Sequence, residues 1–126
     1  MNPDELENLI RSRRSSLLLD AEKQVTNDLL QRITDAAQFA PNHRRTWPLR
    51  VAAVTGASRF VLGNTIADAM AMLGDDEAKV TKARTKYLRS PVVLVVASAT
   101  GSSDNETEEN KYAVAAGIQN MLLMAH

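Results

Sequence analysis

Residues 92–97, Val-Val-Leu-Val-Val-Ala, restrict the possible folds of this 126-residue chain more than any other segment. An uninterrupted apolar run rich in β-branched residues predicts a strand of the parallel type, covered on both of its faces. A second strand is predicted at 49–56, where LRVAAVTG ends in a glycine. Helices are predicted on either side of the strands, so the residues alone indicate a layered α/β arrangement. A sheet usually needs three or more strands for independent stability, so strands are missing from this picture.

Capping residues and apolar spacing predict the helices. The residues NPDE at 2–5 begin the first helix, and RSRRSS at 11–16 closes it with positive charge, which suits the C-terminal end of the helix dipole. Thr26 caps a second helix, which ends before Pro41 because proline disfavours helical geometry in the preceding residue. Two more helices are predicted between the strands, and TGSSDNETEEN after the second strand is predicted as a polar loop.

The last predicted helix runs from about Glu108 to the end of the sequence and is apolar on nearly every side from Ala113 onward. Such a helix belongs in an interior, and the few predicted strands and helices cannot cover it, so we expect a homodimer that buries it. Residues 1–126 contain no internal repeat and no linker, so we predict a single domain. The 44% of hydrophobic residues favours a packed core over disorder.

Charge and cysteine content exclude several classes of function. The 15 Lys and Arg residues balance 15 Asp and Glu residues, so no overall positive field attracts nucleic acid or an anionic membrane. The absence of cysteine excludes disulfides, thiolate metal sites and cysteine nucleophiles. The first residues do not resemble a signal peptide and no apolar run is long enough to span a membrane, which predicts a cytoplasmic protein.

Two short polar segments are candidate ligand sites. In RSRRSS (11–16), guanidiniums beside hydroxyls can hold a phosphate; the alternative is an ordinary charged helix end. In APNHRRTWP (40–48), Asn42, His43 and Arg45 can address the polar edges of a heteroaromatic ligand. The alternative is a loop whose Trp47 packs inward and whose arginines are solvated. No metal site is predicted, because His43 has no second ligand at suitable spacing, and no catalytic acid, base or nucleophile is evident.

Four ordered blocks along the chain resemble the FMN-dependent nitroreductase family, especially its short members with an AP-(N/D)-H loop. The blocks are RRS, APNHRRTWP, RSPVVLVVAS and EENKYAVAAGIQNMLLMAH. The resemblance implies an α+β fold, a layered sandwich with helices around a central, mainly antiparallel sheet, in a homodimer with two FMN sites at its interface. It also implies an oxidoreductase, in which NAD(P)H reduces bound FMN and a nitroaromatic, quinone or similar small-molecule acceptor is then reduced.

The resemblance assigns roles to the two polar segments. Arg13, Arg14 and Ser15 match the RRS that binds the phosphate and ribityl chain of FMN. Asn42 and His43 match the loop that reaches the flavin, in several members from the partner subunit, and Arg45 lies near that loop. No catalytic side chain is implied, because the flavin itself carries the hydride chemistry.

Other positions match the family less directly. Gln119 and Asn120 match a QN pair in the central helix, for which a structural role near the dimer core is implied. Leu17 stands where the family commonly has a basic residue, and Phe39 where close relatives often have arginine. Both departures predict weaker binding of the FMN phosphate.

In the family the chain continues past the last helix to further strands and a basic phosphate ligand. We therefore expect that His126 falls inside a helix of a truncated or incomplete chain that lacks the C-terminal strands. For the isolated 126-residue polypeptide this predicts weak FMN binding and little reductase activity. An alternative of a different class is a non-catalytic flavin-binding or dimerisation module. A small nucleic-acid binder is a third alternative, which the neutral charge disfavours.

Overall fold

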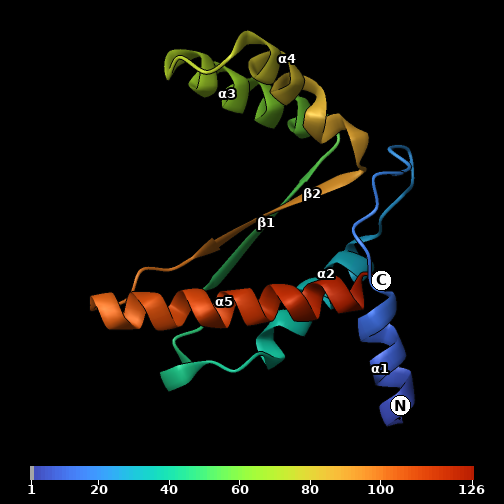
Figure 1. Ribbon diagram of the computed structural model, residues 1–126, viewed down its shortest axis with the longest axis vertical. Helices are drawn as coiled ribbons and strands as arrows, with labels where there is room; N and C mark the ends of the chain where they lie inside the picture. Colours follow the sequence, from blue (N-terminus) through green and yellow to red (C-terminus); the bar gives the residue numbers. More distant parts are fainter. Residues whose placement is uncertain (1) are drawn as a thin grey trace. The chain divides into compact units, whose positions relative to one another are not determined.

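The computed structural model describes residues 2–126 of the chain (Figure 1). Five α-helices, three short 3-10 helices and two strands are assigned among these residues. In chain order they are α1 (Pro3–Ser12), α2 (Asn27–Ala36), η1 (Ala37–Phe39), η2 (His43–Arg45), β1 (Leu49–Thr55), α3 (Ser58–Met72), α4 (Glu77–Lys86), η3 (Tyr87–Arg89), β2 (Val92–Ser98) and α5 (Asp104–Met124).

The N-terminal caps of the helices follow the sequence closely, with one exception. Asn2 forms a capping box with Glu5, and Thr26 accepts a hydrogen bond from the backbone N–H of Leu29, both as predicted. The last helix begins earlier than predicted, because the Ser103 side chain accepts a hydrogen bond from the N–H of Glu106 and caps α5 there. The acidic residues that were predicted to form a loop therefore make up the first turns of α5.

β1 and β2 form an antiparallel pair. The N–H of Ala99, just after β2, donates to the carbonyl oxygen of Pro48, just before β1, at 2.8 Å, so the strands run in opposite directions. The α+β class and the antiparallel sheet implied by the family resemblance are confirmed, and the parallel pairing suggested by the apolar run at 92–97 alone is wrong. That strand is also not covered on both faces within this chain, since Val95 is 43% exposed.

The described residues form two compact units. The first contains residues up to Ser16, Thr26–Val51 and Val96–His126, and the second contains Leu17–Val25 and Ala52–Val95. Each strand contributes residues to both units. A single domain over the whole chain stays a prediction.

In the first unit, α5 packs against α2 and η1 along one face only. Its buried positions recur every three or four residues and are Asn110, Val114, Gly117 and Met121. A Cβ added at Gly117 would lie 3.2 Å from the Cβ of Ala37, so a glycine permits the close approach of η1. The opposite face of α5 is exposed, with Tyr112 and Leu122 on it. The all-round burial predicted for this helix is therefore not achieved within one chain.

In the second unit, α3 crosses α4 at close range. The core of this unit consists of Ala67, Val80 and Ala83, with Ile66 and Met70 packed beside them. Gly63 allows the crossing, because an added Cβ would lie 3.1 Å from the carbonyl carbon of Arg84 and still closer to its oxygen. The Arg84 guanidinium returns to α3 and pairs with Asp68 at 2.8 Å.

Gly63→Val is expected to lower the free energy of unfolding by about 1–3 kcal/mol, the cost of overpacking a rigid contact. The neighbouring atoms at this position belong to the backbone of α4 and cannot rotate away. Ala69→Val, on the exposed side of the same helix, is the matched control and should change stability little. The midpoint of urea unfolding measures both variants, and equal midpoints would contradict the close crossing.

Candidate functional site

Arg13, Arg14 and Ser15 lie where α1 ends. The backbone N–H of Arg13 still bonds to the helix, at Leu9, while its own φ and ψ of −55° and 127° leave helical geometry. The Arg14 guanidinium donates to the carbonyl oxygens of Arg11 and Arg13, and so satisfies helix acceptors that have no partner within the helix. Arg13 is half-buried, and Arg14 and Ser15 are exposed.

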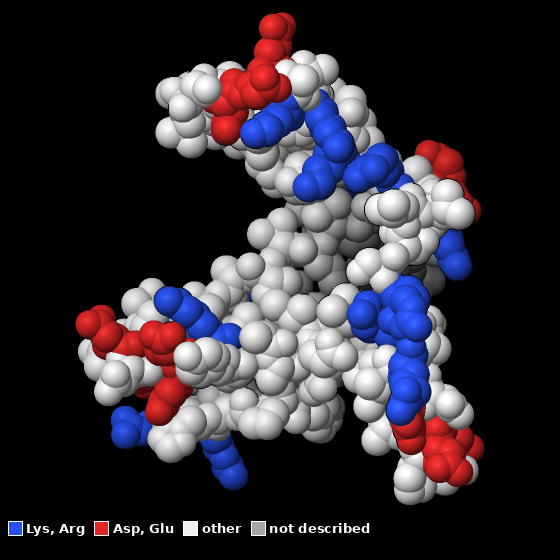
Figure 2. Space-filling view, in the orientation of Figure 1, with Lys and Arg blue, Asp and Glu red and all other residues white. Residues whose placement is uncertain are grey.

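The charges of α1 are separated along its length. Figure 2 shows positive side chains gathered toward the C-terminal end of α1 and acidic ones toward its start. Arg11 is neutralised locally by Glu7 at 2.6 Å. By contrast, the Arg13 guanidinium takes part in no hydrogen bond or ion pair within residues 2–126, so its donors are open to an anionic ligand.

The loop at 40–48 has an unusual backbone. Arg44, Arg45 and Trp47 have φ values of 59°, 52° and 47°, in the left-handed region that residues other than glycine rarely adopt. Each such residue costs about 1 kcal/mol or more, and such strain persists only where surrounding contacts impose it. The arrangement is typical of loops that present side chains for binding.

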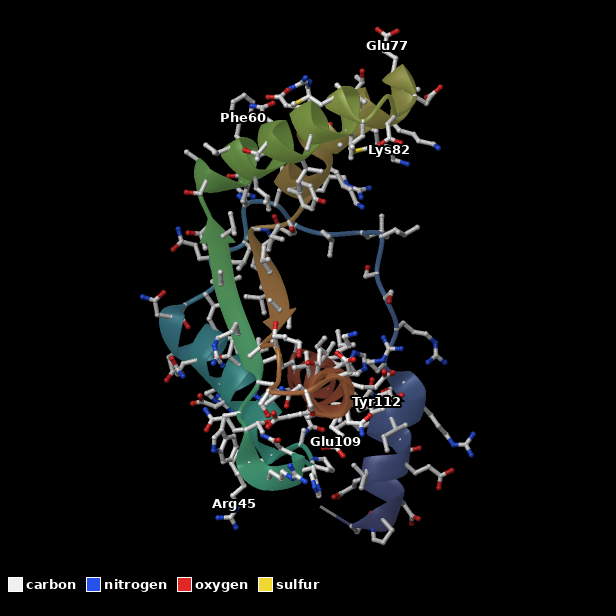
Figure 3. The ribbon with its side chains drawn as sticks, turned by 90° about the vertical axis from the view of Figure 1, so that its left-hand side faces the viewer. Arg45, Phe60, Glu77, Lys82, Glu109 and Tyr112 are labelled. Carbon is white, nitrogen blue, oxygen red and sulfur yellow. The ribbon has the colours of Figure 1, made fainter. Side chains whose placement is uncertain are left out.

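The side chains of this loop are mostly presented to solvent. His43 and Arg45 are exposed, and Figure 3 shows Arg45 directed away from the ribbon. Asn42 is half-buried. Trp47 is 55% exposed and does not pack inward, whereas Arg44 and Arg45 are exposed, as the alternative of a solvated loop also predicts.

A buried polar network joins this loop to α5 and to the end of β2. The Thr46 hydroxyl donates to Oδ1 of Asn110 at 2.6 Å and lies 3.1 Å from Oδ1 of Asn42. Nδ2 of Asn110 donates to the carbonyl oxygen of Ala99 at 3.2 Å. Sequence reasoning did not single out Thr46 or Asn110. The available signal was one asparagine in register with the buried positions of α5, which are otherwise Val, Gly and Met.

A cavity of about 370 Å³ lies beside the loop in the first unit. Of the predicted site residues only Asn42 contributes to it. Its lining residues are Gln31, Thr34, Asp35, Ala37, Gln38, Ala40, Asn42, Trp47, Pro48, Leu49, Arg50, Ala113, Val114 and Gly117. Oδ1 of Asp35, on its wall, accepts hydrogen bonds from Nε2 of Gln31 at 2.7 Å and from Nε2 of Gln38 at 3.0 Å.

A second, more apolar cavity of about 530 Å³ lies at the other end of the same unit, between Leu9, Phe39 and Met124 among others. Phe39 is 85% exposed and adds apolar surface beside this cavity. None of the predicted site residues lines this cavity.

The two predicted binding segments do not meet within one chain. The loop contacts α5 at Asn110, whereas the end of α1 lies at the other end of α5, where Ser12 Oγ is 3.0 Å from Nε2 of His126 (Figure 1). From Asn110 to Met124 the helix axis rises roughly 20 Å at about 1.5 Å per residue. One small ligand cannot easily touch both segments of the same chain.

The carboxylate of Glu106, in the first turn of α5, is stabilised by hydrogen bonds and by a positive charge of the loop. The hydroxyl and backbone N–H of Ser102 donate to the Glu106 carboxylate and hold its pKa below the usual value, with a smaller contribution from the positive charge of Arg44. Because the pKa is lowered in the folded chain, the resulting stabilisation is present at neutral pH. It is lost as the pH falls through that lowered pKa.

Metal binding and membrane insertion find no support in the described residues 2–126. No cluster of three or more His, Cys, Asp or Glu side chains there is arranged to hold a metal ion. None of the helices in that range has both the length and the apolar character needed to cross a membrane.

The model of one protein family covers nearly the whole chain. It is described as the nitroreductase family, and it matches residues 10–126. This chain belongs to the nitroreductase family. The assignment predicted from the four ordered sequence blocks is confirmed.

Individual nitroreductases agree with this assignment. YdjA of Escherichia coli (strain K12), which is named as an NAD(P)H nitroreductase, is 31% identical over 93 residues, or 74% of this chain. The crystal structure of a nitroreductase-like family protein from Bacillus cereus is 27% identical and gives a TM-score of 0.76 over 95% of this chain. The crystal structure of a nitroreductase with bound FMN from Bacteroides fragilis NCTC 9343 is 26% identical in sequence. It gives a TM-score of 0.72 over 99% of this chain.

These comparisons confirm the nitroreductase-like α+β fold. The chain spans 50% of the length of YdjA, and 63% and 65% of the two solved chains.

The QN pair of this nitroreductase-family chain is Gln119 and Asn120. Nδ2 of Asn120 donates to the carbonyl oxygen of Ala36 at 3.2 Å and ties α5 to the end of α2. Gln119 is exposed. The contact of Asn120 agrees with a structural role.

Proposed function

We propose that this chain forms part of an FMN-dependent oxidoreductase. It would pass reducing equivalents from NAD(P)H through bound FMN to a nitroaromatic, quinone or similar small-molecule acceptor. The observation that carries the proposal is the Arg13 guanidinium, whose donors are open at the end of a helix in a chain of the nitroreductase family. The bound FMN of the Bacteroides fragilis structure and the name of YdjA give further support.

The residues at the end of α1 fit a phosphate. An arginine offers paired donors to phosphate oxygens, and a serine hydroxyl adds a short hydrogen bond. We assign the FMN phosphate and ribityl chain to Arg13, Arg14 and Ser15. Arg14 would exchange its bonds to helix carbonyls for bonds to the ligand. Bound FMN supplies the hydride chemistry, and the protein binds and orients it.

The loop side chains Asn42, His43 and Arg45 are assigned to the polar edge of the isoalloxazine ring. Because the loop and the end of α1 lie at different ends of α5, we propose that a second copy of the chain supplies the loop to each site. A two-fold homodimer would complete two identical sites in this way. The exposed face of α5, which includes Tyr112 and Leu122, is the proposed dimer interface.

The decisive experiment combines an absorbance spectrum with a steady-state assay. We expect the purified chain to perturb the spectrum of added FMN and, as predicted for the isolated 126-residue polypeptide, to oxidise NAD(P)H only slowly when a quinone or nitroaromatic acceptor is present. Flavin binding without turnover would instead support a flavin-binding module. The absence of flavin binding at millimolar FMN would contradict the proposal for this chain.

A further inference from the structure

Asn110 is the only polar residue of the described range 2–126 that is buried, with 4% of its surface exposed. A buried amide is costly unless its donor and its acceptor are both satisfied. Both requirements are met here by groups outside the helix, since Oδ1 accepts from Thr46 and Nδ2 donates to Ala99. An apolar residue would fill the same position in α5 without these demands, so the asparagine must serve the segments that it contacts.

Both contacts of Asn110 act on the same loop. Thr46 belongs to the loop itself. Ala99 is bonded to Pro48, the last residue of the loop, because the N–H of Ala99 donates to the carbonyl oxygen of Pro48 at 2.8 Å. Pro48 is buried, but Trp47 beside it is largely exposed. The strained turn that precedes Trp47 is therefore fixed mainly by hydrogen bonds and not by apolar burial.

The Thr46 hydroxyl has a single proton and two nearby oxygens. The distance of 2.6 Å assigns that proton to Asn110, and the distance of 3.1 Å to Asn42 is the longer of the two. Asn42 Oδ1 consequently keeps acceptor capacity for an N–H group of a ligand. In this way Asn110 affects what the side chain of Asn42 can bind.

We propose that Asn110 is a positioning residue, which acts through Thr46 to hold the loop Asn42–Thr46 in the conformation that presents Asn42 and His43 to the flavin. The proposal rests on the FMN function proposed above. Asn110 does not touch the ligand. Its effect is on the loop, so it can be measured with and without FMN.

Trp47 is the only tryptophan of the chain, so its fluorescence reports on this loop directly. We compare Thr46→Val, which removes the hydroxyl at nearly constant volume, with Asn110→Leu and with Thr46→Ser. The readouts are acrylamide quenching of Trp47 without FMN, and the Kd for FMN from flavin fluorescence titration. The midpoint of urea unfolding is recorded for each variant.

Thr46→Val and Asn110→Leu are expected to increase the quenching of Trp47 and to raise the Kd for FMN by about 10-fold. Thr46→Ser should restore both values to those of the wild-type chain. Gly63→Val serves as a control for lost stability, because it lies in the second unit and should leave Trp47 quenching unchanged. Thr46 is only half-buried, so Thr46→Val keeps the test valid if Asn110→Leu fails to fold.

The outcomes separate this proposal from the proposed function. Wild-type quenching of Trp47 in both network variants would overturn the positioning role, whatever FMN does. The positioning role would also be overturned if Thr46→Val raised the Kd for FMN and Thr46→Ser had an equally raised Kd. If Trp47 responds as expected but the wild-type chain binds no FMN, the role of Asn110 in holding the loop stands and the FMN function fails.

Discussion

Arg13→Glu is expected to weaken the binding of FMN by about 100-fold or more. Arg13 has open donors, so its removal takes away a hydrogen bond between two charged groups, worth about 1.5–3 kcal/mol. The glutamate adds repulsion between its carboxylate and the phosphate. About 2.7 kcal/mol corresponds to a 100-fold change in Kd, so the two effects together reach this range.

The matched control is Arg11→Glu, two residues earlier in α1. It makes the same change in net charge, but Arg11 is already paired with Glu7 on the helix surface. Titration of FMN fluorescence measures the Kd for both variants. A similar loss of affinity in both would show that only the general positive field near α1 matters, and it would contradict a direct contact between Arg13 and the phosphate.

The sequence predicted those parts of the fold that depend on neighbouring residues. The capping of α1 by Asn2 and of α2 by Thr26 involves groups three residues apart, and both predictions are confirmed. The start of α5 was missed because the acidic residues after Ser103 were interpreted by composition as a loop. A serine cap followed by acidic residues in the first turn is a helix start, since these charges suit the N-terminal end of the dipole.

Strand direction and burial were harder to predict. The apolar run of β2 is the same whether its neighbour is parallel or antiparallel. The family resemblance implied the antiparallel direction, and the bond between Ala99 and Pro48 agrees with it. The run also predicted cover on both faces, which the described residues do not provide for Val95. An apolar pattern records what must be buried, but it does not say whether the cover comes from the same chain.

Some residues of the candidate site could be predicted from the sequence, and others could not. RRS and the loop at 40–48 were found because local clusters of donors are visible in a sequence. The pair of Thr46 and Asn110 was not found, because the two residues are 64 positions apart and each looks ordinary in its own segment. Contacts of this kind arise only from the folded arrangement. They decide where the donors of the loop lie, and therefore what they can bind.

Ala115→Arg is expected to convert the proposed homodimer into a monomer. Ala115 is exposed on α5, on the side away from the buried stripe, and the apolar side chains of Tyr112 and Leu122 are exposed on the same helix. A guanidinium forced between two closely packed copies of this helix face costs several kcal/mol, enough to separate the subunits. Arginine has nearly the helix propensity of alanine, so α5 itself should be unaffected.

Light scattering after size-exclusion chromatography distinguishes the 13.8 kDa monomer from a dimer of twice that mass. Ala71→Arg places the same charge on the exposed side of α3, and this control should stay dimeric. Because each flavin is proposed to need the loop of the second copy, Ala115→Arg should also lose FMN affinity, although it changes no residue of either binding segment. A monomeric variant with the FMN Kd of the wild-type chain would contradict a shared site, and a variant that stays dimeric would exclude this face of α5 as the interface.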